Sequence, residues 1–128
     1  MSLAYWMILA AGLIPYLATG YAKFAAGGRK TYDNHAPRAN IDGLPPQRLR
    51  AYWAQLNGFE AFPLFAAAVI VAHAAGAAQS TIDGLAVSFV VLRVIYTLLY
   101  IYDKPTARSI AWAAALACII GLFVAAAR

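Results

Sequence analysis

Long apolar runs alternate with polar stretches along the chain, and four of the runs are long enough to cross a bilayer. They cover roughly residues 3–24, 50–75, 83–102 and 106–126. A helix needs about 20 mostly apolar residues to span the ~30 Å hydrocarbon layer. The runs are rich in Ala and Leu and lack the period-two alternation of barrel strands. The pattern therefore predicts an all-α fold, an integral membrane four-helix bundle.

The connections between the runs differ in length and composition. The first, residues 25–49, holds the Gly, Pro, Asn and Asp that mark irregular backbone. The other two are short, so the second, third and fourth spans are expected to be antiparallel neighbours. No internal repeat divides the chain, and we expect residues 1–128 to form a single domain.

Composition and charge support the same interpretation. Hydrophobic residues make up 63% and charged residues 12% of the chain, whereas soluble domains carry about 45–50% and about 25%. Basic residues gather in the first and third connections and are absent from the second. Lys and Arg accumulate in cytoplasmic loops, so both termini are expected on the non-cytoplasmic side, in a bacterial inner membrane. Because orientation explains the basic charge, no nucleic-acid partner is expected.

Polar residues interrupt two of the spans. Gln55, Asn57 and Glu60 lie in the second span, and Arg93 lies in the third. Glu60 and Arg93 are each about ten residues, or about 15 Å, from the cytoplasmic side. An unpaired charge at that depth costs at least ~2.5–3.5 kcal/mol. We therefore expect Glu60 to pair with Arg93, and helical spacing places Arg50 and Asn57 on the same stripe as Glu60.

A second stripe follows Arg93 along the third span. Tyr96 and Tyr100 stand three and seven residues after it, and Arg108 begins the fourth span at the cytoplasmic rim. Together the stripes predict a polar cleft between helices that binds a ligand. Interhelical hydrogen bonds that only hold the bundle together are the alternative, and the two tyrosines could equally be interfacial anchors.

No metal site is expected from the histidines. His35 and His73 lack partners at the spacing of metal ligands. Cys118 is the single cysteine, so it forms no disulfide within the chain.

Three motifs carry a resemblance to a known family. They are "AQLNGFEAFPLF" at 54–65, "RVIYTLLY" at 93–100 and "ARSIAW" at 107–112. In this order they resemble the MAPEG family, the membrane-associated proteins in eicosanoid and glutathione metabolism, and within it the leukotriene C synthase and microsomal glutathione transferase branch. The similarity covers most of residues 29–112.

The resemblance implies a fold, an activity and partners. Subunits of four helices would form a homotrimer, with glutathione as the co-substrate bound between neighbouring subunits near the cytoplasmic face. The enzyme would be a glutathione transferase or peroxidase acting on lipophilic electrophiles or lipid hydroperoxides. Its partners would be its own copies, membrane lipid and a lipophilic small-molecule substrate.

The resemblance also assigns roles to residues. The positions that fall on glutathione-binding ones are Gln55, Asn57, Glu60, Tyr96 and Tyr100. Glu60 would receive the amino group of the tripeptide, and arginines such as Arg93 would receive its carboxylates. Arg108 falls on the arginine that stabilises the thiolate. Arg29 or Lys30 corresponds to a basic pair near the end of the first helix.

Two positions depart from the family pattern. Trp53 stands where the leukotriene branch has a carboxylate-binding arginine, and Ala61 stands where it has a tyrosine. Arg48 or Arg50 could replace the missing arginine from the preceding turn. These departures favour an alternative, a non-enzymatic MAPEG-like membrane subunit that binds lipid or scaffolds a partner complex. A small transporter is a weaker alternative, since the chain lacks repeat symmetry.

Overall fold

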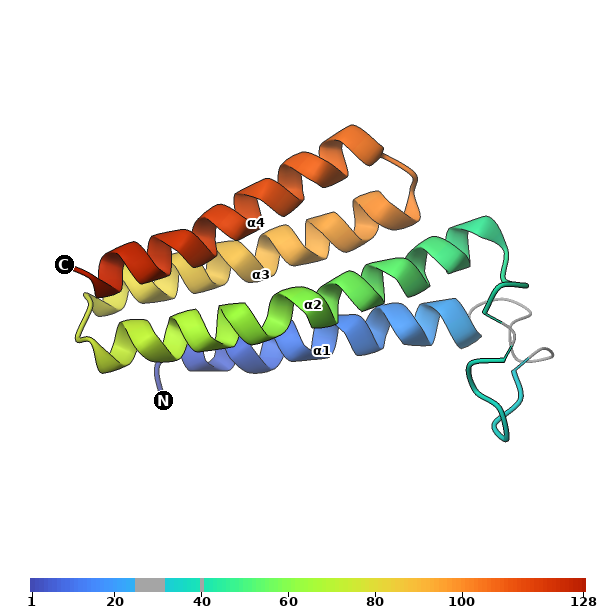
Figure 1. Cartoon of the computed structure of the whole chain (residues 1–128), viewed down its shortest axis with the longest axis horizontal. Coiled ribbons are helices and arrows are strands. Elements are labelled where there is room, and N and C mark those ends of the chain that lie inside the picture. Colours follow the sequence, from blue (N-terminus) through green and yellow to red (C-terminus); the bar gives the residue numbers. More distant parts are fainter. Residues whose placement is uncertain (25–31, 40) are drawn as a thin grey trace.

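Four helices form the protein in the computed structural model, which describes residues 1–24, 32–39 and 41–128 (Figure 1). They are α1 (Leu3–Phe24), α2 (Pro46–Ala74), α3 (Gln79–Ile101) and α4 (Pro105–Ala126). Each helix is long and apolar enough to cross a membrane. The predicted all-α membrane bundle is confirmed, and the chain is a multi-pass integral membrane protein.

The helices lie side by side in an up-and-down order. Both termini lie at one end of the bundle, and the long first connection and the α3–α4 turn lie at the other (Figure 1). α1 packs along α2, and α3 packs along α4, while α2 and α3 each contact all three other helices. Most polar residues of the predicted site therefore lie on the two central helices, and Arg108 lies near the start of α4.

Two helices begin about one turn before the apolar runs that predicted them. α2 starts at Pro46, where a proline is compatible with the first turn because the N–H it lacks would be unpaired there. α3 starts at Gln79, after Gly76 has ended the preceding turn with a φ of 74°. Asp83 then accepts hydrogen bonds of 2.8 Å from the backbone N–H of Ala4 and from the Gln79 amide. Asp83 thus caps the start of α1, and its bond with Gln79, four residues earlier, joins side chains within the first turn of α3.

Small residues and two stacked rings bring the central helices together. Phe65 of α2 and Phe89 of α3 stack with their centroids 3.9 Å apart. Two turns earlier on α2, Gly58 meets Pro15 of α1 so closely that an added Cβ would lie 2.7 Å from the proline Cγ. Such contacts are typical of membrane helices, where small residues allow the backbones to approach.

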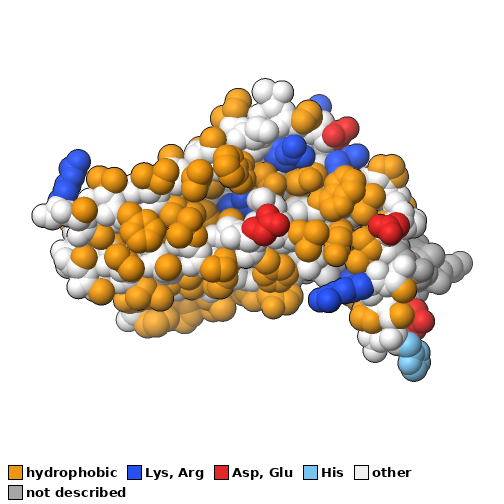
Figure 2. Space-filling model, viewed as in Figure 1, with side chains coloured by type: hydrophobic (Ala, Val, Ile, Leu, Met, Phe, Trp, Pro, Cys, Tyr) orange, Lys and Arg blue, Asp and Glu red, His pale blue; other side chains and the backbone are white. Residues whose placement is uncertain are grey.

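Large apolar side chains cover the outside of the bundle. Figure 2 shows hydrophobic side chains over most of the visible helical surface, with the charged ones concentrated towards the loop end. Leu17, Ile110 and Ile120 are more than half exposed. This surface would be unfavourable in water, and it suits contact with lipid tails.

Candidate functional site

Two cavities meet at Asn57 and Glu60 on α2. We call the first the aromatic groove; it has a volume of about 510 Å³ and is lined by Trp53, Leu56, Asn57, Glu60, Tyr96 and Tyr100. We call the second the apolar cavity; it has a volume of about 240 Å³ and is lined by Asn57, Glu60, Ala61, Leu64, Phe89, Arg93, Trp112, Ala115, Leu116 and Ile119. A ligand in the groove and a ligand in the cavity would therefore come together at the same two polar side chains.

A hydrogen-bonded chain of three polar side chains lies at this junction. Arg93 donates from Nη2 to Oδ1 of Asn57 at 2.9 Å, and Asn57 donates from Nδ2 to Oε2 of Glu60 at 3.2 Å. Arg93 is 4% exposed, whereas Glu60 is exposed. Among the described residues Glu60 and Arg93 have no direct contact, so the predicted pairing of the two charges takes place through the Asn57 amide.

Two tyrosine rings of α3 lie between two guanidinium groups, from Arg93 at this junction to Arg108 of α4 at the rim. The guanidinium carbon of Arg93 lies 4.2 Å from the centroid of the Tyr96 ring, and that of Arg108 lies 4.3 Å from the Tyr100 ring. The two tyrosine rings meet edge to face at 5.8 Å. Trp53 faces the same row, with its ring 6.4 Å from that of Tyr100. The predicted stripe therefore exists, and its charges are held over aromatic faces.

The burial of Tyr96 decides whether this tyrosine is an anchor at the membrane interface. Its side chain is only 5% exposed and lies between Arg93 and Tyr100. A residue that anchors a helix at the membrane interface has to reach the lipid head groups. Tyr96 is therefore not such an anchor, and it belongs to the interior of the site.

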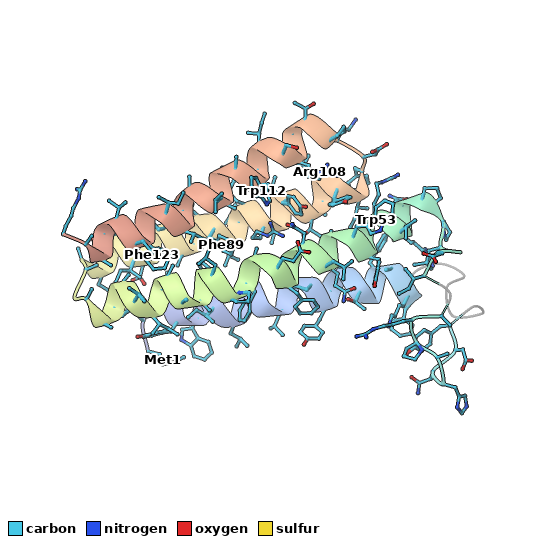
Figure 3. The ribbon with its side chains drawn as sticks, in the orientation of Figure 1. Met1, Trp53, Phe89, Arg108, Trp112 and Phe123 are labelled. Atoms are coloured by element: carbon cyan, nitrogen blue, oxygen red, sulfur yellow. The ribbon has the colours of Figure 1, made fainter. Side chains whose placement is uncertain are left out.

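The two tryptophans of the site lie at different depths. Figure 3 shows Trp53 on α2 and Arg108 near the start of α4, both towards the loop end of the bundle. Trp112 and Phe89 lie further towards the termini, between the helix pairs (Figure 3). Polar recognition at the loop end and apolar recognition deeper in the bundle are thus separated along the same helices.

Four of the predicted site residues in the described part of the chain line neither cavity: Arg48, Arg50, Gln55 and Arg108. Arg108 lies beside the aromatic groove, against the Tyr100 ring. Arg50 donates from Nε to the backbone carbonyl of Ile101 at 3.2 Å and so binds the end of α3. Arg48 is buried, with 9% of its side chain exposed. Gln55 stands two residues before Asn57, so it points about 200° around the helix from it. Neither Arg48 nor Arg50 lines the aromatic groove.

Gln55 has an unusual environment of its own. Its Oε1 is buried and has no hydrogen-bond partner within the described part of the chain. An unpaired buried acceptor costs about 1–3 kcal/mol.

Arg29 and Lys30, the remaining predicted basic pair, lie outside the described residues.

The apolar cavity was not predicted from the sequence. Its walls are residues such as Leu64, Phe89 and Leu116, which are typical of any transmembrane helix and follow no diagnostic spacing. The one available signal is Ala61, because a small residue beside Glu60 leaves space next to a charged group. Recognising the cavity required the packing of α2, α3 and α4 against one another.

Comparison with known proteins gives a single match. The model of the MAPEG family matches residues 3–128, which include all four helices and every residue that lines the two cavities. No curated protein sequence and no solved structure matches the chain.

Proposed function

Because the chain belongs to the MAPEG family, we propose that this membrane protein is a glutathione transferase that conjugates lipophilic electrophiles and reduces lipid hydroperoxides. The observation that carries the proposal is the row of Arg93, Tyr96, Tyr100 and Arg108, two rings between two guanidinium groups, beside the Asn57–Glu60 hydrogen bond. Tyr96, Tyr100 and Glu60 line the groove, and the guanidinium groups of Arg93 and Arg108 lie against the two tyrosine rings. Glutathione carries the matching groups, which are two carboxylates, one ammonium and a thiol.

The groove offers a partner for each end of glutathione. The exposed Glu60 carboxylate would accept hydrogen bonds from the ammonium group, and Asn57 fixes its orientation from one turn away. The hydroxyls of Tyr96 and Tyr100 are donors for a carboxylate or for the sulfur. Arg108 stands at the rim, where its guanidinium is partly exposed and already held by the Tyr100 ring.

A guanidinium beside the sulfur would make the thiol reactive at neutral pH. A free thiol has a pKa near 8.5 and is mostly protonated, while the thiolate is the nucleophile. A nearby positive charge favours the thiolate and lowers the pKa of the thiol. In our proposal Arg108 provides this charge, and the released proton goes to water at the cytoplasmic rim.

The bond changes in the two reactions are simple. In conjugation the thiolate attacks an electrophilic carbon, a C–S bond forms, and the leaving group departs with the electron pair of the bond that breaks. In hydroperoxide reduction the thiolate attacks the terminal oxygen, the O–O bond breaks, and the lipid alcohol leaves after taking up a proton. A second glutathione then displaces water from the sulfenic acid, so two thiols are oxidised to a disulfide and one hydroperoxide is reduced.

We further propose that the chain works as a homotrimer. Glu60 is exposed on a helix whose neighbouring side chains, such as Leu56 and Leu64, are apolar and also exposed. A charged side chain in contact with lipid tails is costly. A neighbouring subunit that covers the aromatic groove would remove Glu60 from lipid and leave room for a polar ligand between the subunits.

Replacing Arg108 with Ala is expected to slow conjugation of glutathione to a chlorodinitrobenzene by about 10²-fold. Binding of glutathione should weaken only modestly, because the lost charge acts mainly on the thiolate. Steady-state kinetics and calorimetry on protein in detergent separate the two effects. Lys104→Ala is the matched control, since it removes a positive charge from the same rim at an exposed position. Normal turnover by the Arg108 variant would exclude this role.

The affinity for glutathione is expected to be low, and Trp53→Arg should raise it. The groove lacks the carboxylate-binding arginine of the leukotriene branch, and Arg50 is bound to the Ile101 carbonyl instead. A charge-assisted hydrogen bond contributes roughly 1.5–3 kcal/mol, so the variant should bind glutathione tighter by about tenfold or more. Calorimetry with millimolar glutathione measures both proteins. No heat of binding in either protein would favour the non-enzymatic membrane subunit.

A further inference from the structure

We propose that one buried water molecule links α1 to the polar site, by accepting a hydrogen bond from the Arg93 guanidinium and donating one to the backbone carbonyl of Ala11. Its site is a small cavity between α1, α2 and α3, to which Ala11, Pro15, Gly58 and Arg93 all contribute. We call this the proline cavity. The site is independent of the proposed function, because it holds a buried charge in place and takes no substrate.

Pro15 leaves one backbone carbonyl of α1 without its helical donor. It lies inside α1, and proline has no N–H, so the carbonyl of Ala11, four residues earlier, receives no hydrogen bond from that position. A freed carbonyl in a membrane span is tolerated where a neighbouring helix, a hydroxyl side chain or an ordered water donates to it. Thr19, the only Ser or Thr of α1, donates to the Pro15 carbonyl instead, at 2.9 Å. Ala11 is 6% exposed, so its donor has to come from inside the bundle.

Arg93 has N–H groups available on the same side of the bundle. A guanidinium group carries five N–H donors, and among the described residues the one hydrogen bond of Arg93 goes to Asn57. The side chain is 4% exposed and lines the proline cavity. A buried charge is costly unless its polar atoms are hydrogen-bonded. A donor with too few acceptors and an acceptor without a donor therefore border the same small space.

The size and charge of the proline cavity select water as the occupant. Its volume is about 10 Å³, close to the ~10–15 Å³ that one water needs and far below the ~150 Å³ that holds benzene. A metal cation is unfavourable beside the Arg93 guanidinium, because like charges repel. A buried water needs at least two polar partners, and the guanidinium and the Ala11 carbonyl provide them.

The water would extend the hydrogen-bonded chain of the site to a third helix. Glu60, Asn57 and Arg93 already join α2 to α3, and the water continues this chain to α1. The close contact between Gly58 and Pro15 holds α1 against α2 beside the cavity. The proline thus both makes the carbonyl available and closes the space around it.

Thermal unfolding of two proline variants tests the link between α1 and Arg93. Pro15→Ala supplies the missing N–H, and alanine in place of a helix-interior proline should raise the Tm. The new N–H also takes the Ala11 carbonyl from the water that Arg93 holds. The Tm should therefore rise less in the wild type than in an Arg93→Met background, where no charge needs the water.

Pro63→Ala is the matched control for this cycle. Pro63 also lies inside a helix, α2, but it is exposed and does not line the proline cavity. Its replacement should change the Tm equally in the two backgrounds. An equal rise of the Tm for Pro15→Ala with and without Arg93 would overturn the proposal.

A structure of the whole chain in lipid, at a resolution that shows ordered water, tests the site even if Arg93→Met fails to fold. One water should lie within about 2.7–3.2 Å of both the Ala11 carbonyl oxygen and a guanidinium nitrogen of Arg93. It should be lost in the Pro15→Ala, Gly58→Ala double variant, where the new N–H binds the carbonyl and the new methyl group occupies space left by the proline ring. A direct hydrogen bond from Arg93 to the Ala11 carbonyl, or no water between them, would overturn the proposal.

Discussion

Asn57→Leu is expected to lower the free energy of unfolding by about 2–3 kcal/mol. Leu has the same branched shape and number of non-hydrogen atoms as Asn but can neither accept from Arg93 nor donate to Glu60, the two bonds that the amide makes at 2.9 and 3.2 Å. The Arg93 guanidinium is 4% exposed and would lose its bond to Asn57 inside the membrane. Thermal unfolding in detergent, followed by circular dichroism, measures the loss.

Two further variants test whether the loss of stability comes from the hydrogen bond between Asn57 of α2 and Arg93 of α3. Gln55→Leu, an amide replacement two residues earlier, should cost little, because the Gln55 Oε1 already has no partner within the described residues. In a double-mutant cycle, Arg93→Met should recover much of the loss in the Asn57→Leu protein, since the unpaired charge is gone. Equal losses for Asn57→Leu and Gln55→Leu would mean that the Asn57 bonds contribute nothing.

Gly58→Ala is expected to destabilise the bundle by about 1–3 kcal/mol, the usual effect of overpacking. The added Cβ would lie 2.7 Å from Cγ of Pro15, and that atom belongs to a ring and cannot rotate away. The methyl group would therefore push α1 away from α2, directly beside Asn57. Thermal unfolding in detergent detects this loss of stability. The affinity for glutathione should also fall, because the aromatic groove is displaced.

The matched control for this prediction is another helical glycine. Gly84 on α3 has nothing within 4 Å of an added Cβ, so Gly84→Ala should cause no loss of stability. Pro15→Ala removes the clashing Cγ, and in the Pro15→Ala background Gly58→Ala should cost much less. If Gly58→Ala and Gly84→Ala behaved alike, the close approach of α1 and α2 at Gly58 would be contradicted.

The fold was predictable because a bilayer constrains the chain so strongly. Every backbone polar group in hydrocarbon has to be satisfied within the span, so an apolar run of sufficient length becomes a helix. The boundaries were less predictable. The segment before Asp83 was interpreted as a turn because it is polar, but α3 already begins at Gln79, whose side-chain amide donates to Asp83.

The site was predictable in part, for a related reason. Helical spacing places Arg93, Tyr96 and Tyr100 on one stripe whatever their neighbours are, and the structure contains that row. Spacing could not reveal that Arg50 turns towards the Ile101 carbonyl or that the Gln55 Oε1 is buried without a hydrogen-bond partner among the described residues. Those outcomes depend on which helix lies on which side of α2.

The amino-acid sequence by itself determined that four helices cross a membrane and that a carboxylate, an amide and a guanidinium lie at similar depth on two of them. Hydrophobicity and helical periodicity are local properties, so the chain needs no partner to express them. Only the tertiary structure decided that Asn57 links the two charges and that a cavity opens beside them. Both depend on the distances between helices, which are set by contacts such as Phe65 with Phe89 and Gly58 with Pro15.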